Sequence, residues 1–577
     1  MKLQTGSVDR AGSVPTAHTT RGTVRPEGTS CQAMVAVAWV VSWLGTSAVF
    51  DGAASSLPSN QRPERVWFAT GFDRPEDFQD PEWQGKLVRG EGRGGGGSLQ
   101  VYCASSDSPP GSKVITRTLP VDAARGCLVR ATAWVQAEEV SERPRPWNGI
   151  KFMLAIETPR QRMWPQADMP VGTFAWQRAA FTTRIPSDAK TIQLVLGLES
   201  VTGRVWFDDV RLVVAAEPRL APTNRSDRPF RGHPLARLRG AMVSPDLDPE
   251  GLRVLGQEWG ANLVRWQLVQ QAAPGHRPPL ESYESWLEQA LRKLDAALPW
   301  CERYGLYVVV DLHSPPGGRA IAGHYVASND RLFSDPQAQA KLISAWQQIA
   351  QRYRGSKVIW GFDLVNEPVE EFVEEGCDDW PALAERVARA IQAVDPDRTL
   401  IVEPAQWGGP AEFVDWVPLP LSNVVYSVHM YEPHRFTHQG VYDNDPPVRY
   451  PGVINGEWWD STRLAETLRP VREFQQRYRV HIYVGEFSAI RWAPDGSARR
   501  YLRDLVELFE AWGWDWTYHA FREWHGWSVE HGEDRVQTEP LTPPTDRQQW
   551  LRSWFARNEK PPWWQLPRGS GPEPRDP

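Results

Sequence analysis

The sequence predicts two folded domains, an N-terminal all-β jelly roll or sandwich and a C-terminal (β/α)8 TIM barrel. The chain has 577 residues, which is too long for one ordinary domain. Short alternating apolar runs fill residues 64–214, whereas a repeated order of strand, loop and helix fills residues 238–558. Such a repeat is typical of a closed parallel barrel, so we expect the barrel in the second region.

Residues 1–63 are interpreted as a signal-like segment followed by a disordered leader. The apolar stretch at residues 34–50 is preceded by three arginines, Arg10, Arg21 and Arg25. Small residues follow it, and cleavage near Ala54 fits a secretory signal. An uncleaved membrane anchor and a true start later than Met1 are the alternatives, because the stretch is just short of a comfortable span. We therefore expect a secreted, extracellular or cell-envelope (periplasmic) protein that is not membrane-bound after processing.

Residues 64–214 are predicted to form the sandwich because short apolar runs recur there between turn residues. The runs are VWFATGF, SLQVYC, CLVRATAWVQ, IKFMLAIET, RAAFTTRIP, TIQLVLGLE and RVWFDDVRLVV. Glycines at 94–97 and the segment SDSPPGS separate neighbouring runs. This spacing of short strands indicates a β-sandwich or jelly roll.

Two segments outside the predicted domains are rich in proline. Residues 215–237 also contain several arginines and are interpreted as a linker that drapes over the next domain. Residues 559–577 are expected to be a disordered tail.

The composition excludes some classes of partner. The chain carries 64 Lys and Arg against 71 Asp and Glu, a formal net charge of -7. Neither nucleic acid nor an anionic membrane surface is indicated, because positive charge is not in excess. Five cysteines are too few for a disulfide scaffold. The 30 tryptophans supply flat faces that stack on sugars or build cores.

The barrel strands are expected at apolar runs in residues 238–558. In chain order they are LRGAMV, NLVRWQL, LYVVVDLH, VIWGFDLV, TLIVEP, VVYSVHMY, HIYVGEF and WDWTYHAF. Stretches with helical periodicity, such as SYESWLEQALRKLDAALPWCERYG, lie between most of them. Active sites of such barrels lie at the carboxyl ends of the strands, on the loops that follow.

Polar residues gather at these strand ends. In chain order they are Arg265, Asp311, His313, Asn366, Glu367, His429, Tyr431, Glu486 and Trp524. Glu367 and Glu486 each follow a run of large apolar residues, where a carboxylate is costly unless water, a partner or chemistry accounts for it. Two glutamates at one rim suit glycosidic bond cleavage, in which one carboxyl protonates the departing oxygen and the other attacks the anomeric carbon. The sequence shows no HExxH motif and no metal-ligand spacing, so no catalytic metal is expected.

The barrel region resembles glycoside hydrolase family 5, within the wider clan A of retaining barrels. LVNEP resembles the acid/base signature of that clan, and YVGEF resembles its nucleophile signature. NLVRW, DLH and SVHMY are similar to the family at strands two, three and six. The resemblance implies that Glu367 is the acid/base and that Glu486 is the nucleophile, with no cofactor required.

The resemblance also implies roles for the neighbouring residues. Arg265 and Tyr431 would hydrogen-bond Glu486, and Asn366 would hold the sugar 2-hydroxyl. His313 and His429 would line the subsite at the cleaved bond. Trp524 would stack on the sugar there, with Trp527 as the alternative, because the usual strand-eight tryptophan comes here in the string YHAFREWHGWSVE, which contains both.

The N-terminal domain resembles jelly-roll carbohydrate-binding modules. The resemblance rests on WFDDV in its last expected strand and on FAWQRAAFTTRIP upstream. It implies a structural calcium ion, to which Asp73 and Asp209 would contribute. The alternative is a domain that only packs against the barrel.

Together these observations predict a retaining β-glycoside hydrolase of plant-type β-glucan polysaccharide, most simply an endo-β-1,4-glucanase. A β-mannanase and an exo-β-glucosidase or β-1,3-glucanase of the same family are alternatives within enzymes. A non-catalytic carbohydrate-binding protein is the alternative from another class. The expected partner is a polysaccharide or oligosaccharide, and the sequence does not indicate an oligomeric state.

Overall fold

The computed structural model describes residues 65–564, apart from 84–85, 107–108, 223–227, 271–276, 323–325 and 443–444. The predicted signal-like segment at 1–63 and the part of the predicted tail from 565 onward therefore lie outside the described residues. Residues 559–564 were also predicted to be disordered, and this was wrong. They pack on the barrel, because Lys560 Nζ donates hydrogen bonds to Gly256 O (2.7 Å) and Ala261 O (2.8 Å). Among the described residues, no helix is both long and apolar enough to span a membrane.

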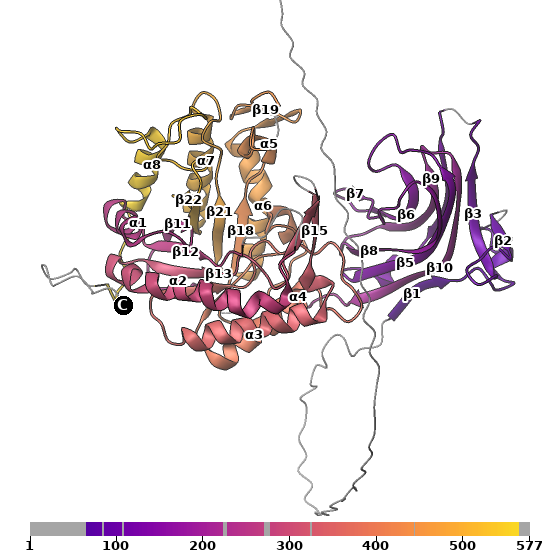
Figure 1. Ribbon diagram of the computed structural model, residues 1–577, viewed down its shortest axis with the longest axis horizontal. Helices are drawn as coiled ribbons and strands as arrows, with labels where there is room; N and C mark the ends of the chain where they lie inside the picture. The colour runs from indigo at the N-terminus through magenta and orange to yellow at the C-terminus, as the bar shows by residue number, and fades with distance from the viewer. Residues whose placement is uncertain are drawn as a thin grey trace, which may run out of the picture. The chain divides into compact units, whose positions relative to one another are not determined.

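The N-terminal domain is a sandwich of two antiparallel sheets, as predicted (Figure 1). The larger sheet has the order β2-β3-β10-β5-β8, with β1 paired to β10, and the smaller has the order β4-β9-β6-β7. The strands are β1 Arg65–Thr70, β2 Leu87–Arg89, β3 Gly97–Cys103, β4 Ser112–Thr118, β5 Leu128–Val140, β6 Gly149–Glu157, β7 Arg162–Met163, β8 Gly172–Arg184, β9 Thr191–Glu199 and β10 Gly203–Ala216.

Alternation along the strands builds the core of the sandwich. In β9, Ile192, Leu194 and Leu196 are fully buried, and Phe152 of the paired strand β6 joins them in one apolar cluster. Successive strand side chains point to opposite faces, so a two-residue period places one whole set inside. This is the pattern from which the sequence predicted strands.

The expected calcium ligands lie near each other at one edge of this sandwich. Asp73 Oδ1 accepts a hydrogen bond from Gly97 N (2.7 Å), and Asp208 Oδ2 accepts one from Arg93 N (2.8 Å). Burial raises the pKa of Asp208 to about 6, with Asp209 and Asp73 adding to the effect. Asp208, which the sequence did not single out, thus adds a third carboxylate beside the two expected ligands. The calcium ion stays a prediction.

The C-terminal domain is a closed barrel of parallel strands in the order β11-β12-β13-β16-β17-β18-β21-β22, which confirms the predicted fold. The barrel strands are β11 Arg239–Val243, β12 Leu263–Gln267, β13 Tyr307–Asp311, β16 Ile359–Asp363, β17 Thr399–Val402, β18 Val424–Met430, β21 Ile482–Phe487 and β22 Asp515–Phe521. Each coincides with one of the runs expected from the sequence.

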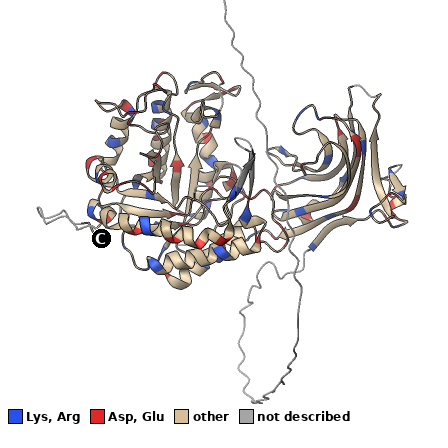
Figure 2. Cartoon of the chain, viewed as in Figure 1, with Lys and Arg blue, Asp and Glu red and all other residues tan. Residues whose placement is uncertain are grey.

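Helices cover the outside of the barrel (Figure 1). They are α1 Pro249–Arg253, α2 Tyr283–Tyr304, α3 Pro336–Arg352, α4 Trp380–Val394, α5 His434–Thr437, α6 Ser461–Tyr478, α7 Ser497–Trp512 and α8 Asp546–Phe555. Acidic and basic residues are interspersed along their ribbons (Figure 2).

Two hairpins extend loops of the barrel. Strands β14 Arg319–Ala322 and β15 Val326–Asp330 follow β13, and strands β19 Gly452–Ile454 and β20 Glu457–Trp459 follow β18. The sequence did not predict them, because their apolar runs are only a few residues long. Trp458 is 59% exposed on the second hairpin.

The described end of the predicted linker closes the amino-terminal end of the barrel. Leu235 joins an apolar cluster with residues at the beginnings of the strands, including Leu263 of β12 and Tyr307 of β13. Trp360 Nε1 donates a hydrogen bond to Arg231 O (2.9 Å). The segment therefore drapes over the barrel, as the sequence suggested, and supplies part of its packing.

Candidate active site

The two predicted glutamates meet at the carboxyl ends of the strands. Glu486 lies in β21 and pairs in register with His429 of the adjacent strand β18. Glu367 follows the end of β16. Oxygen atoms of Glu367 and Glu486 and a ring nitrogen of His429 all lie within 4.8 Å of one another. Glu367 and Glu486 therefore share one site, although they are 119 positions apart in the sequence.

Glu486 is buried and held by two donors. Its Oε1 accepts a hydrogen bond from Arg265 Nη1 (2.6 Å), and its Oε2 accepts one from Tyr431 Oη (2.9 Å). Burial alone would raise the pKa of Glu486, but the neighbouring His429, His519 and Arg265 outweigh it and hold that pKa well below its usual range. Glu486 is therefore an ionised carboxylate fixed in orientation, as a nucleophile requires.

Glu367 has an unusual backbone for a residue other than glycine. Its φ is 47°, in the left-handed region, where a side chain costs energy unless its surroundings impose the conformation. Its amide donates a hydrogen bond to Glu403 Oε2 (2.9 Å), and its carbonyl accepts one from Arg319 Nη2 (2.8 Å). These two contacts hold the strained peptide and aim the mostly buried carboxyl toward the site.

His429 lies among three carboxylates. Its Nδ1 is 2.9 Å from Glu367 Oε1 and 3.9 Å from Glu486 Oε2, and its Nε2 is 3.2 Å from Glu403 Oε1. Burial would lower the pKa of His429, but Glu403 and Glu486 raise it well above its ordinary value. A charged imidazole here keeps the two candidate catalytic carboxyls close together without mutual repulsion.

Arg265 is the centre of a buried ionic network. Its guanidinium lies within 3.2 Å of four carboxylates, those of Asp311, Asp363, Glu403 and Glu486. It also donates to Asn366 Oδ1 (2.9 Å), which turns the amide group of Asn366 so that its NH₂ remains as a donor. The sequence predicted the contact with Glu486 but missed Asp363 and Glu403. A signal existed for Glu403, since VEP ends strand five much as NEP follows strand four.

His313 stands at the end of strand three, as predicted. Its Nδ1 is 2.8 Å from Asp311 Oδ2, and its side chain is one quarter exposed. Burial would lower the pKa of His313, and Asp311 and Glu486 more than compensate, so the pKa is raised. The structure thus brings His313, His429, Tyr431 and Asn366 to the same rim as the two glutamates.

Trp524 packs against two other tryptophans. Its ring centroid is 5.9 Å from that of Trp492 and 5.6 Å from that of Trp527. Trp527 is nearer to the predicted catalytic groups, with its ring 6.1 Å from that of Tyr431. Stacking of Trp524 on a sugar stays a prediction, and Trp527 gains support as the aromatic neighbour of the reacting groups.

His519 takes the strand-eight position beside Glu486. Its Nδ1 is 3.3 Å from Glu486 Oε2, and its Nε2 is 3.1 Å from Glu523 Oε2. The sequence analysis did not single out either His519 or Glu523, although both occur in the string YHAFREW. Their signal was a histidine near the end of a buried strand, which local pattern alone does not separate from a packed core histidine.

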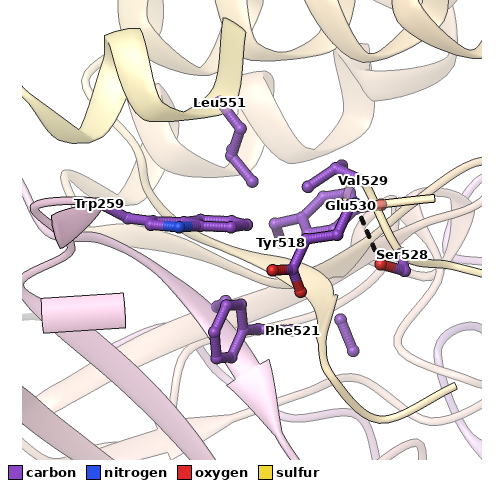
Figure 3. A pocket seen from close by; sticks show the side chains of 9 residues that line it. Trp259, Tyr518, Phe521, Ser528, Val529, Glu530 and Leu551 are labelled. Atoms are coloured by element: carbon purple, nitrogen blue, oxygen red, sulfur yellow. Dashed lines mark hydrogen bonds between the residues drawn. The ribbon is translucent and has the colours of Figure 1, made fainter. Parts of the chain in front are cut away.

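Other side chains of β22 contact the segments that follow the barrel. Tyr518 and Phe521 of β22 line an apolar pocket with Trp259 and with Leu551 of α8 (Figure 3). A hydrogen bond from Glu530 N to Ser528 Oγ (3.1 Å) closes one side of it. The predicted catalytic glutamates do not line this pocket, so we interpret it as packing between the barrel and α8.

The spacing of Glu367, His429 and Glu486 would also suit a metal ion, as would that of His233, His481 and Asp515. In the first group, Arg265 and Tyr431 already engage both oxygens of Glu486. In the second group, both imidazoles lie within hydrogen-bond distance of Asp515 Oδ2. Both groups are thus explained by hydrogen bonds and ion pairs.

The barrel region is similar to known proteins. Residues 244–528 match the family model described as Cellulase (glycosyl hydrolase family 5). Endoglucanase C of Acetivibrio thermocellus is 27% identical over 276 residues, which cover 42% of this chain and 78% of that protein. Cellodextrinase A of Ruminococcus flavefaciens is 24% identical over 249 residues, covering 42% and 70%. A structure of Thermotoga maritima Cel5A with cellobiose, in a mutant form, aligns with a TM-score of 0.43 and 22% identity over 57% of this chain and 99% of that one.

Two carboxyls converge at the carboxyl-terminal rim of a parallel barrel, and this segment matches a cellulase model. These features together define a glycoside hydrolase. By that match, the barrel carries a Cellulase (glycosyl hydrolase family 5) domain over residues 244–528.

Proposed function

We propose that the protein is a secreted, retaining endo-β-1,4-glucanase that cleaves plant-type β-glucan by double displacement. The convergence of Glu367 and Glu486 within 4.8 Å carries the proposal. Retaining enzymes need carboxyls about 5–5.5 Å apart, whereas inverting enzymes leave room for a water molecule between them. Relatives named endoglucanase and cellodextrinase support a glucan as the substrate. The apolar stretch at 34–50 supports secretion.

In the first step, Glu486 attacks the anomeric carbon and Glu367 transfers its proton to the departing glycosidic oxygen. The leaving group departs as an alcohol, and an ester bond joins the sugar to Glu486. Arg265 and Tyr431 keep Glu486 ionised and oriented before this attack. Asn366, fixed by Arg265, is placed to hold the sugar 2-hydroxyl as the transition state forms.

In the second step, Glu367 accepts a proton from water, and the water oxygen attacks the anomeric carbon. The ester bond breaks, Glu486 leaves as a carboxylate, and the sugar keeps its original configuration. Forming the ester removes the negative charge of Glu486, so Glu367 can then act as a base. His429, next to both carboxyls, balances charge in each step.

The nucleophile assignment is tested with Glu486→Ala and an aryl β-cellobioside. We expect kcat to fall by at least about 10³-fold, because the ester can no longer form. Added azide should restore turnover and give a product of inverted configuration. Glu473→Ala, an exposed change on α6, serves as the control and should keep the activity of the parent. Hydrolysis by Glu486→Ala at the rate of the parent would refute the assignment.

The substrate is tested by a product profile on cellulose oligomers, mannan, xylan, lichenan and laminarin. An endo-β-1,4-glucanase should cut cellulose oligomers and lichenan at internal bonds and release mixed short oligosaccharides. Release of glucose alone from chain ends, or a preference for mannan or laminarin, would contradict the proposal in favour of an alternative activity of the family.

A further inference from the structure

His519 lies between two carboxylates at the end of β22. One ring nitrogen, Nε2, is 3.1 Å from Glu523 Oε2, and the other, Nδ1, is 3.3 Å from Glu486 Oε2. Tyr431 Oη makes a very short contact with the same Nδ1 and donates to Glu486 Oε2 (2.9 Å). A continuous chain of polar contacts therefore runs from Glu523 through His519 and Tyr431 to Glu486.

The protons available to this chain restrict the state of His519. The hydroxyl of Tyr431 has a single proton to donate. If Nδ1 of His519 carries no proton, Nδ1 and Glu486 Oε2 compete for the hydroxyl proton, and donation to Nδ1 takes a donor from Glu486. If Nδ1 carries a proton, it donates to Tyr431 Oη, and the hydroxyl proton stays on Glu486. An ionised Glu523 also needs a proton on Nε2, so all contacts are satisfied only when both nitrogens are protonated.

The charges around His519 favour that doubly protonated form. Burial would lower the pKa of His519, but Glu486 and Glu523 outweigh it and raise that pKa, against an opposing contribution from Arg265. The titratable and charged groups that face the ring come from four barrel strands and their loops and from the segment after α5: Arg265, Tyr431, His438, Glu486 and Glu523.

The neighbours of His519 support the same assignment. The pKa of His438 is lowered to about 2 by burial and by His434 and His519, so His438 adds no positive charge. Burial would raise the pKa of Glu523, but His519 and Gln267 lower it, so Glu523 is ionised. Its side chain is partly exposed, which keeps the carboxylate hydrated and charged.

We propose that Glu523 and a protonated His519 act as a positioning pair that keeps the Tyr431 hydroxyl donating to Glu486, and that this pair sets an alkaline limit to activity. The proposal rests on the proposed role of Glu486 as the nucleophile. Neither member of the pair forms a bond to the sugar in this role. Above the pH at which His519 loses its proton, the Tyr431 hydroxyl turns to Nδ1 and the nucleophile loses one of its two donors.

The test uses a substrate that does not need an acid for bond cleavage, such as 2,4-dinitrophenyl β-cellobioside. With such a leaving group, kcat/KM no longer depends on protonation of Glu367. The parent should still lose activity at alkaline pH. In Glu523→Gln this alkaline limb should move about one pH unit lower, because the removed charge no longer raises the pKa of His519. In His519→Gln the plateau should fall roughly tenfold, and the limb should disappear.

Matched variants separate positioning from folding. Glu523→Asp keeps the charge and should restore most of the alkaline limb of the parent. Glu539→Gln, an exposed change on the same connection between β22 and α8, should leave the profile unchanged. An NMR titration of the histidine rings should find His519 charged at neutral pH in the parent and titrating at lower pH in Glu523→Gln, whether or not His519→Gln folds.

Two results would overturn the proposal. One is an alkaline limb of kcat/KM that is the same in Glu523→Gln as in the parent, and the other is a His519 ring that is neutral at neutral pH. Either result, with Glu486→Ala still inactive and rescued by azide, would refute the positioning pair alone. Activity of Glu486→Ala at the parent rate would instead refute the proposed function on which the pair depends.

Discussion

Arg265 has no solvent exposure and lies against four carboxylates. A buried charge is tolerated when it is paired and hydrogen-bonded, and the planar guanidinium offers five donors for that purpose. Burial raises the pKa of Asp363 well above its usual value, with Glu403 adding to the effect and Arg265 opposing it. The positive charge of Arg265 also lowers the pKa of Glu486 and so favours its ionised form.

Glu403 links this network to the candidate acid/base. It accepts the amide proton of Glu367 (2.9 Å) and lies 3.2 Å from His429 Nε2. We expect Glu403→Gln to lower kcat by about 10²-fold, because the strained peptide of Glu367 loses its charged acceptor and the acid shifts out of line. The measurement is kcat and KM on an aryl β-cellobioside, with thermal unfolding to confirm the fold. A kcat within about twofold of the parent would contradict this role.

At the scale of elements, aspartates mark the starts of several barrel helices. Asp335 caps α3 by accepting from Gln337 N (2.9 Å), and Asp379 caps α4 by accepting from Ala382 N (3.2 Å). A proline stands in the first turn of each of these helices, where its missing N–H costs nothing. Helix boundaries in the barrel thus follow from local sequence.

Removing one cap tests this account. Asp335→Ala should lower the free energy of unfolding by about 1 kcal/mol, because an amide of the first turn of α3 loses its acceptor. Asp335→Asn keeps an acceptor, so its free energy of unfolding should fall by less. Chemical denaturation measures both variants, and the activity of each should equal that of the parent. Equal stability of Asp335→Ala and the parent would show that the cap contributes nothing.

At the scale of the whole molecule, the linker and the last barrel strand share a buried charge at the amino-terminal end. Asp515 accepts from Leu238 N (2.8 Å), and its Oδ2 lies 2.8 Å from His233 Nε2 and 2.6 Å from His481 Nε2. Burial would raise the pKa of Asp515, but the two histidines hold it well below its usual value. One carboxylate therefore ties residues from three distant segments together.

This depressed pKa makes stability depend on pH in a defined direction. Asp515 contributes to the free energy of unfolding at pH values above about 4, which is the pKa of an aspartate in the unfolded chain. This contribution is lost as the pH falls below that value toward the lower pKa of the folded state. Asp515→Asn should lower the free energy of unfolding at neutral pH by about 3 kcal/mol and should flatten its decline in acid. Urea unfolding from neutral pH to about pH 3 measures both effects. Asp397→Asn, an exposed change, is the control, and the same acid dependence in Asp515→Asn and the parent would contradict the assignment.

Sequence patterns alone determined the two domains, the barrel strands and the two candidate catalytic glutamates. Each of these depends on local features: the period of apolar residues, the caps, and a glutamate directly after a buried run. The polar neighbours Arg265, His313, Asn366, His429 and Tyr431 could be predicted for the same reason, because parallel strands of a barrel end at one rim.

Only the tertiary structure decided which groups surround those glutamates. Glu403 reaches the peptide of Glu367 because β16 and β17 are neighbours in the closed barrel. His519, rather than Trp524, contacts Glu486 because of the path of β22 and the loop that follows it. Such contacts depend on barrel closure and on loop conformation, which bring distant side chains within hydrogen-bond range. The distances between these side chains determine the pKa shifts of the ionisable groups, and a local sequence pattern carries no information on those distances.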